Sequence, residues 1–153
     1  MKKILSFIVD RNKQILLLRN NPVDCKHGGD FWYTVTGGFE PGEKNGALVC
    51  KREIKEETNL DVIECIYLNL VFKYITNNIK CDEYVYVSFV DSADNLILDK
   101  EENIDYEWCS FEEVVKKIRW CGDLEQFPKL LKSAINKELF LGEETIVSTE
   151  SFY

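Results

Sequence analysis

The chain has 153 residues, of which 45% are hydrophobic and 30% charged, a composition typical of a globular domain with its own core. Its 19 basic and 27 acidic side chains give a formal net charge of −8. This charge excludes the basic footprint of a protein that binds long nucleic acid. A small anionic ligand stays compatible with it, because a metal ion and a few local Lys or Arg side chains can reverse the sign inside a pocket.

The cysteines and the N-terminus indicate where the protein works. Six cysteines are scattered without a CxxC pair, and a single histidine gives a zinc site little support. The apolar run over residues 4–9 is broken by Asp10 and Arg11, and no small-residue cleavage site follows. No stretch is long enough to span a bilayer. We expect a cytoplasmic protein with reduced thiols and no membrane partner.

The first third of the chain reads as strands and a loop. Two apolar runs, residues 4–9 and 14–19, flank a turn-rich break and predict a β-hairpin. Residues 20–30 contain one Pro and two Gly and predict a loop. Residues 31–36 are aromatic and β-branched, which predicts a third strand.

The remainder mixes helices and strands. A helix is predicted over residues 45–58, with Asn59 as a left-handed cap. Residues 62–74 and 84–90 are β-rich, and an Asn pair within 76–78 marks a turn between them. Ser110 predicts the N-cap of a helix over 111–120, and a last helix covers 127–139. The tail over 142–153 has no strong period and is expected to be loose. The pattern predicts one α/β or α+β layered domain over residues 1–153.

The helix over residues 45–58 carries the chemistry. Glu53 lies three and four positions before Glu56 and Glu57, so the three carboxylates share one helix face. Like charges at this spacing repel each other and do not stabilise a helix. A hard divalent cation holds them together, since Mg²⁺ prefers carboxylate and phosphate oxygens. The alternative is a solvated surface face, but the Gly pair before the helix and the cap after it favour a built site.

This stretch, GGFEPGEKNGALVCKREIKEETNL, resembles the Nudix box. The matching residues are Gly37, Glu43, Arg52, Glu53, Ile54, Glu56, Glu57 and Leu60. There are two departures from the family pattern. Eight residues, not seven, separate Glu43 from Arg52, and we expect the extra one in the loop at residues 44–46. Asn59 replaces the last Gly, a small change because Asn tolerates positive φ.

The resemblance implies a Nudix α/β/α sandwich with a mixed central sheet. It also implies an enzyme that uses water and Mg²⁺ or Mn²⁺ to cleave a nucleoside diphosphate linked to another group. Glu53, Glu56 and Glu57 would be metal ligands, with the backbone carbonyl of Thr36 reaching the metal. Catalytic roles would fall to Glu53, Glu56 and Arg52, the last orienting a glutamate.

Further site residues are expected around the box. Gly37 would let its loop pass close to the metal, and Glu43 would fix the loop and the helix. Counting back from Trp108, Glu102 takes the place of the family's downstream acid, which is a metal ligand or the general base. The sequence leaves open whether Glu102 or Glu53 is the base, and a solvated acidic loop is the alternative for Glu102.

Two residues are candidate substrate contacts. Arg19 either contacts a substrate phosphate or is a charge at a strand end. Trp32 either stacks on a base or fills the core. The wording Phe-Trp-x-x-Val-Thr-Gly before the box resembles one branch, the dihydroneopterin triphosphate pyrophosphatases that also cleave dATP.

Three functions are open at this point. The first is cleavage of a nucleoside or pterin triphosphate to monophosphate and pyrophosphate. The second is the same chemistry on a dinucleotide, a nucleotide sugar or a capped end. The third is a Nudix-fold ligand-binding module without catalysis, against which the intact Arg-Glu cluster argues. In each the partner is a small anionic compound, and the oligomeric state, a homodimer included, is left open.

Overall fold

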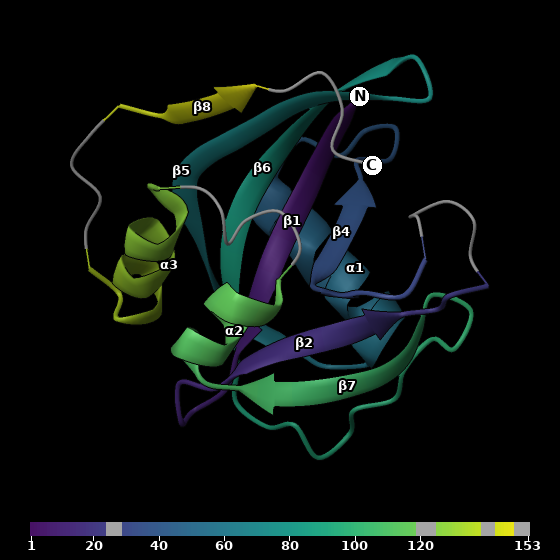
Figure 1. Ribbon diagram of the computed structural model, residues 1–153, viewed down its shortest axis with the longest axis vertical. Helices are drawn as coiled ribbons and strands as arrows, with labels where there is room; N and C mark the ends of the chain where they lie inside the picture. The colour runs from purple at the N-terminus through teal and green to yellow at the C-terminus, as the bar shows by residue number, and fades with distance from the viewer. Residues whose placement is uncertain (24–28, 119–124, 139–142, 149–153) are drawn as a thin grey trace.

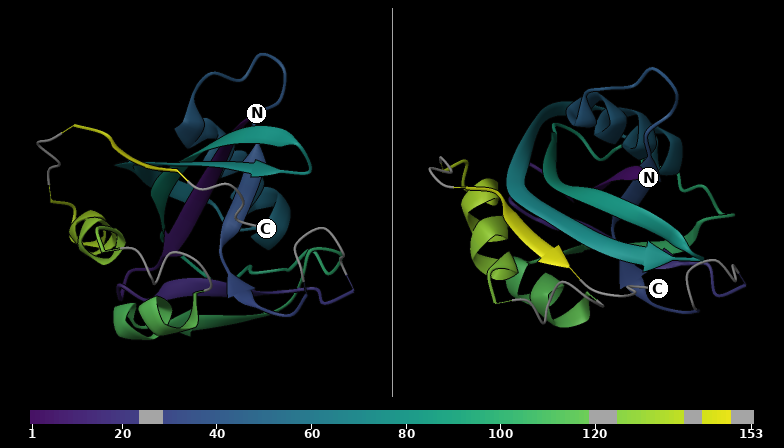
Figure 2. Two further views of the ribbon diagram at one scale, coloured as in Figure 1. Left: turned by 45° about the horizontal axis from the view of Figure 1, so that its top comes forward. Right: turned by 90° about the horizontal axis from the view of Figure 1, so that it is seen from above.

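A computed structural model describes residues 1–23, 29–118, 125–138 and 143–148 of the chain. These residues form a mixed sheet with helices on both of its faces (Figures 1 and 2). None of the helices in the described ranges is both long and apolar enough to cross a membrane.

The strands and helices alternate irregularly along the chain. The strands are β1 (Lys2–Val9), β2 (Ile15–Asn20), β3 (Trp32–Tyr33), β4 (Val35–Gly38), β5 (Val62–Thr76), β6 (Ile79–Val90), β7 (Asn103–Cys109) and β8 (Thr145–Ser148). The helices are α1 (Gly46–Thr58), α2 (Phe111–Lys117) and α3 (Phe127–Ile135).

The sheet runs in the order β3-β2-β1-β6-β5-β8, with β4 paired to β1 and β7 paired to β2. The β1–β6 and β5–β8 pairs are parallel and the other pairs antiparallel. The pairing of β1 with β4 places Gly37 opposite Ile4. It thereby anchors the loop that leads into α1 at the start of β1.

Alternation along the strands divides the core in two. Leu5, Phe7 and Val9 of β1 face one buried cluster, and Ile4 and Ile8 face the other. The first cluster is covered by α2 and α3, the second by α1, as the view along the sheet shows (Figure 2). This arrangement confirms the predicted α/β/α sandwich with a mixed sheet.

Several predicted elements agree with the structure. The first two strands form the expected antiparallel hairpin. Between β5 and β6, Asn77 and Asn78 have φ values of 48° and 63°, as a two-residue hairpin turn with positive φ requires. Ser110 caps α2, and its side chain and that of Glu113 form a reciprocal capping box.

Other predictions are corrected. The predicted strand over 31–36 is two short strands, because β3 pairs with β2 and β4 turns away to pair with β1. The sixth strand begins at residue 79, well before the predicted 84. The helix α2 ends at Lys117, with Ile118 as its C-cap, and residues 119 and 120 lie outside the described ranges.

The C-terminal part also differs from the prediction. The helix α3 ends at Ile135, where the next residue no longer has helical backbone, so it is shorter than the predicted 127–139. Within the tail expected to be loose, β8 adds to the sheet as a parallel neighbour of β5. Its alternately half-buried and exposed side chains give too weak a pattern to predict a strand.

Candidate active site

The ends of α1 fix the position of its carboxylates. The Asn45 side chain accepts hydrogen bonds from the backbone N–H groups of Ala47 and Leu48, which caps the N-terminus. At the other end Asn59 is left-handed, with φ 62°, and its N–H bonds the carbonyl of Lys55. Asn45 thus caps the start of the helix and Asn59 its end, which confirms the predicted Asn59 cap.

Arg52 ties the helix to the preceding loop. Its guanidinium donates to both carboxylate oxygens of Glu43, at 2.8 and 3.0 Å, and to the carbonyl oxygen of Gly38 at 3.0 Å. It also donates to Glu53 at 2.9 Å and to Glu56 at 3.3 Å. The hydrogen bonds from Arg52 lower the pKa of the Glu43 carboxyl. The extra residue between Glu43 and Arg52 thus leaves their two-pronged pair intact.

Glu53 lies directly against the loop. A β-carbon on Gly37 would overlap the side-chain atoms of Glu53, whereas one on Gly38 would meet only the sulfur of Met1 at 3.8 Å. The Glu53 side chain is 15% exposed. Burial raises the pKa of this carboxyl, even though Arg52 opposes the shift.

Glu57 is the most deeply buried acid of α1. It is 6% exposed, and its Oε1 accepts from the Asn103 amide at 3.3 Å. Its Oε2 is the one buried side-chain oxygen or nitrogen in the described ranges that has no hydrogen-bond partner. Burial raises the pKa of the Glu57 carboxyl well above its usual range, and the charges of Glu102 and Glu53 add to this.

Glu102 approaches this pair from another part of the chain. Its backbone is held by hydrogen bonds with Asp99 and Asn21, next to the start of β7. Its charge raises the pKa of both Glu53 and Glu57. The predicted acids of α1 and the predicted downstream acid Glu102 therefore lie close enough for their charges to interact.

The donor set fits a divalent cation. The charge of Glu102 raises the pKa of both Glu53 and Glu57, and Glu57 has a buried oxygen without a hydrogen-bond partner, so these three carboxylates concentrate negative charge. Such a site is costly unless protons or a cation neutralise it. All of the oxygens are hard ligands of the kind that Mg²⁺ and Mn²⁺ take. Glu56, exposed and one position before Glu57, extends the site toward solvent.

Thr36 immediately precedes Gly37 and pairs with Leu5 across β4 and β1. The Thr36 backbone is therefore next to Gly37, the residue of β4 against which Glu53 packs. A metal contact through its carbonyl stays a prediction.

The two predicted substrate contacts lie beside each other on β2 and β3. Arg19 pairs with Trp32 across the strands, and its guanidinium forms two hydrogen bonds with Asp30, at 2.9 and 2.7 Å. Trp32 is half-buried against the core cluster under α2, and the Lys117 ammonium lies 5.7 Å from its ring centroid. Both side chains have protein partners, and their contact with substrate stays a prediction.

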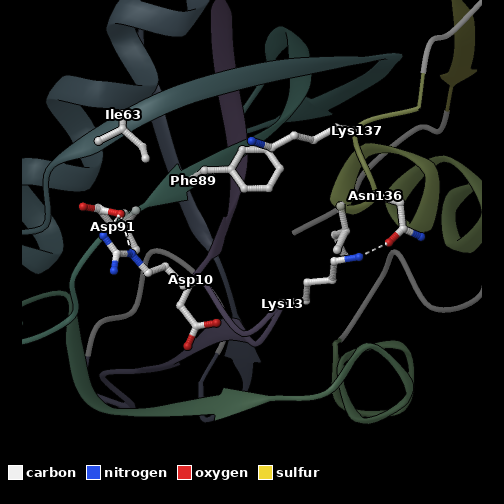
Figure 3. Close-up of a pocket in the computed structure, with 10 residues that line it drawn as sticks. Asp10, Lys13, Ile63, Phe89, Asp91, Asn136 and Lys137 are labelled. Carbon is white, nitrogen blue, oxygen red and sulfur yellow. Dashed lines mark hydrogen bonds and ion pairs between the residues drawn. The ribbon is translucent and has the colours of Figure 1, made fainter.

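Two other features lie apart from this site. Glu107, Cys109 and Glu113 bring ligand atoms within 4.8 Å of one another, but Glu107 pairs with Lys117 at 2.7 Å and Glu113 completes the α2 capping box. A pocket near the end of β1 is lined by Phe89, Asp91 and neighbours, and is shown in Figure 3. It lies at the opposite end of β1 from the strand pairing that holds Gly37.

The sequence reasoning missed Asn103. Its amide donates a hydrogen bond to the buried Glu57, and no role was predicted for it. The signal that could have found it is its place directly after Glu102, at the start of a strand. The sequence reasoning did not predict β7, because charged residues interrupt its apolar ones.

Comparison with known proteins agrees with the geometry. The family model described as the NUDIX domain matches residues 2–130. A solved structure of a Nudix hydrolase from Listeria monocytogenes superposes with a TM-score of 0.71 at 19% identity, covering 93% of this chain and 99% of that one. The structure of the Escherichia coli dihydroneopterin triphosphate pyrophosphohydrolase superposes with a TM-score of 0.65 at 19% identity, covering 88% of this chain and 95% of that one.

A third solved structure is the NUDIX domain of Shewanella oneidensis NrtR in complex with ADP ribose. It gives a TM-score of 0.64 at 10% identity, over 90% of this chain and 87% of that one. At these identities the structural likenesses establish the fold. Because the family model spans most of its length, the chain belongs to the Nudix family, as a hydrolase of phosphorus-containing acid anhydrides.

Proposed function

We propose that the protein hydrolyses a nucleoside or pterin triphosphate to the monophosphate and pyrophosphate, with Mg²⁺ or Mn²⁺ as cofactor. The observation that carries this proposal is the buried, unpartnered Glu57 oxygen beside two further carboxylates. A cluster of this kind destabilises a metal-free protein, so its presence is accounted for by a ligand that needs it.

The chain's own residues take the following roles. Glu57 and Glu56 would hold the cation together with the Thr36 carbonyl, and Glu53 and Glu102 would each be either a further ligand or the base. A bound divalent cation would offset the negative charge of the phosphates and lower the pKa of the attacking water. Arg52 holds Glu53 and Glu56 in place through its rigid, planar donor set.

Hydrolysis needs a group that accepts a proton. As a water oxygen bonds to phosphorus and the anhydride bond to the departing pyrophosphate breaks, one proton of that water passes to a carboxylate. We propose Glu53 for this role, because burial raises the pKa of its carboxyl, which makes it a better proton acceptor than an exposed carboxylate. Glu102 is the second candidate for the base, since its charge acts on Glu53 and Glu57.

A second substrate class has support of its own. The NrtR NUDIX domain of similar fold binds ADP ribose, a nucleoside diphosphate linked to another group. In this alternative the same residues cleave the diphosphate of a dinucleotide or a nucleotide sugar. The triphosphate proposal is preferred for its two supports, the FWYTVTG wording before the box and the likeness to the E. coli pyrophosphohydrolase.

Product analysis by ion exchange tests the proposal. The purified protein is incubated with Mg²⁺ and nucleoside triphosphates, dihydroneopterin triphosphate, dinucleotides and nucleotide sugars, in parallel with Glu56→Gln. We expect monophosphate and pyrophosphate from a triphosphate, abolished by a chelator and strongly reduced in the variant. Products from only a dinucleotide or nucleotide sugar would favour the second class, and ligand binding without any product would contradict hydrolysis.

A further inference from the structure

A pocket of about 230 Å³ opens beside the β1–β2 turn, at the opposite end of β1 from Gly37 (Figure 3). Its walls come from that turn, the start of β5, the end of β6 and the residues at the end of α3. None of the residues assigned to the proposed active site lines it, so the two are separate. An apolar cavity of about 150 Å³ holds a benzene molecule, so this pocket has room for a compound with one ring or one branched chain.

The floor of the pocket is apolar. Phe89 of β6 and Ile135 of α3 are 8% and 6% exposed, and both belong to the core cluster under α2 and α3. Ile63 of β5 stands at the edge of the pocket and is 65% exposed. A ligand with an apolar body takes both the floor and this exposed side chain out of contact with water, which favours binding.

Two ion pairs neutralise most of the charges around this floor. The Arg11 guanidinium lies 2.5 Å from the Asp91 carboxylate, and the Lys137 ammonium lies 2.6 Å from the Glu64 carboxylate. The Lys137 ammonium also lies 4.6 Å from the centroid of the Phe89 ring, a favourable contact of a cation with an aromatic side chain. These charged groups therefore have partners of opposite charge within the protein.

Lys13 and Asp10 are the charged lining residues that lack such a partner. The Lys13 ammonium donates to the side-chain oxygen of Asn136 at 2.8 Å, and this partner is neutral. The Asp10 carboxylate accepts from the backbone N–H groups of Asn12 and Gln14, both at 2.9 Å. Within the described ranges no ion pair involves either side chain, so the rim of the pocket carries one unpaired charge of each sign.

The backbone of two lysines is a second observation that points to this pocket. Lys13 and Lys137 have φ values of 59° and 56°, a left-handed conformation that side chains with a β-carbon disfavour. Every other residue with positive φ in the described part of the chain is an Asn or a Gly, the residues that tolerate it best. Strained residues of this kind cluster at ligand-binding sites, and both lysines line the same pocket.

We propose that this pocket is a binding site for a free α-amino acid with an apolar side chain. The side chain of the ligand lies against Phe89 and Ile63. Its carboxylate accepts a hydrogen bond from the Lys13 ammonium, and its own ammonium group donates to the Asp10 carboxylate. A zwitterion answers both unpaired charges at once, whereas an organic anion leaves the Asp10 charge unpaired and an organic cation leaves that of Lys13.

An NMR titration tests this site on the wild-type protein. The ¹⁵N-labelled protein is titrated with L-phenylalanine, without metal or nucleotide, and its amide signals are followed. We expect saturable shifts of pocket residues such as Asp91 and Lys137. N-acetyl-L-phenylalanine lacks the ammonium group and L-phenylalanine methyl ester lacks the carboxylate, so each should bind about tenfold more weakly, the effect of one lost charge-assisted hydrogen bond. Glycine has no apolar side chain and should cause no saturable shift.

Two variants assign the charged contacts. Lys13→Asn removes the ammonium and introduces a residue that tolerates positive φ, so the turn keeps its conformation. Its Kd for L-phenylalanine should rise about tenfold, while its Kd for the methyl ester, which has no carboxylate, should stay at the wild-type value. Asp10→Asn keeps an oxygen for the two backbone donors and should show the same pattern with the N-acetyl compound. Lys44→Asn, an exposed change in the loop before α1, is the matched control and should leave every Kd unchanged.

The proposal is overturned if L-phenylalanine causes no saturable shift, or if its shifts centre on residues away from the pocket. Equal affinities of L-phenylalanine and both blocked compounds would also overturn it, because the charges of the rim would then play no part. The titration uses neither metal nor substrate, so its result is independent of the proposed function. Failure of the protein to hydrolyse any phosphorus-containing anhydride would leave this binding site standing.

Discussion

The carboxylate of Glu53 occupies the space beside Gly37 where any other residue would carry its β-carbon. The glycine is thus required by a close approach, not by its backbone angle, because Gly37 is absent from the positive-φ residues of the described ranges. This contact links the loop before α1 to the carboxylate proposed as the base.

Replacing Gly37 tests this contact. In Gly37→Ala the new methyl group overlaps Glu53, which must move away from the loop. A displacement near 1 Å at a catalytic group lowers turnover by about 100-fold. Steady-state kinetics should show this loss in kcat. Gly38→Ala is the matched control, since its β-carbon meets only the Met1 sulfur at 3.8 Å. Equal rates for the two variants would contradict the contact's importance.

The proposed role of Glu102 is tested by comparing its Gln variant with that of the adjacent Glu101. Glu102→Gln removes a charge that acts on both Glu53 and Glu57, and we expect kcat to fall by about 100-fold, because Glu102 is proposed as a further metal ligand or the second candidate for the base. In metal-free buffer the same variant should melt at a higher temperature, because a like-charge repulsion is gone. Glu101→Gln, one residue earlier and exposed, should change neither quantity. A normal rate in Glu102→Gln would return Glu102 to the solvated-loop interpretation.

Asn59 replaces the last Gly of the box pattern at the end of α1. This position predicts a difference in stability between two variants. Asn59 has φ 62°, and its side chain donates to the Asn95 carbonyl at 2.9 Å. Both Asn59→Ala and Asn59→Gly lose that hydrogen bond, so their difference isolates the backbone. Urea unfolding should show the Ala variant to be less stable than the Gly variant by about 1 kcal/mol. Equal stabilities would show that the cap conformation relaxes.

A buried carboxyl on β6 predicts a pH dependence. Glu83 is 1% exposed, accepts a hydrogen bond from the Tyr74 hydroxyl at 2.7 Å and lies 3.7 Å from the Lys3 ammonium. Burial raises its pKa above the ordinary value of 4.5, and Lys3 only partly opposes this. The protonated form is therefore the one that folding favours.

The sign of the pH dependence follows from the upward shift of the Glu83 pKa. The stability that Glu83 contributes is fully present below its unfolded pKa and is lost as the pH rises through its raised folded pKa. Glu83→Gln does not titrate at this position. Urea unfolding from pH 4 upward should show the wild type losing stability relative to the variant, and then a plateau. A difference that is constant over this range would show that the pKa of Glu83 is not shifted.

Local signals accounted for much of the fold. The Asn59 cap, the Asn77-Asn78 turn and the Ser110 N-cap each depend on a few adjacent residues, and each was predicted from the sequence. The division of residues 31–36 into β3 and β4 was not readable, because it is decided by which strand each half pairs with. The parallel addition of β8 depends on β5, a partner some 75 residues away in sequence.

The same distinction applies to the site. Spacing along one helix placed Glu53, Glu56 and Glu57 together, and counting back from Trp108 in the stretch that resembles the family pointed to Glu102. The hydrogen bond from Asn103 to Glu57 joins residues 46 positions apart and came only from the structure. Nor could the sequence show that Arg19 is already paired with Asp30, which depends on the pairing of β2 with β3.

The most direct test of the central claim is the rate of pyrophosphate release, with Mg²⁺, by Glu57→Gln. This change keeps the side-chain volume and removes the buried charge whose oxygen has no protein partner. Since a metal supplies several kcal/mol to the transition state and each 1.36 kcal/mol is tenfold in rate, we predict a fall of about 100-fold or more. The metal-free variant should be at least as stable as the wild type. Glu112→Gln, an exposed change outside the cluster, should retain the wild-type rate. A near-normal rate in a folded Glu57→Gln protein would contradict the assignment of this cluster as the catalytic metal site.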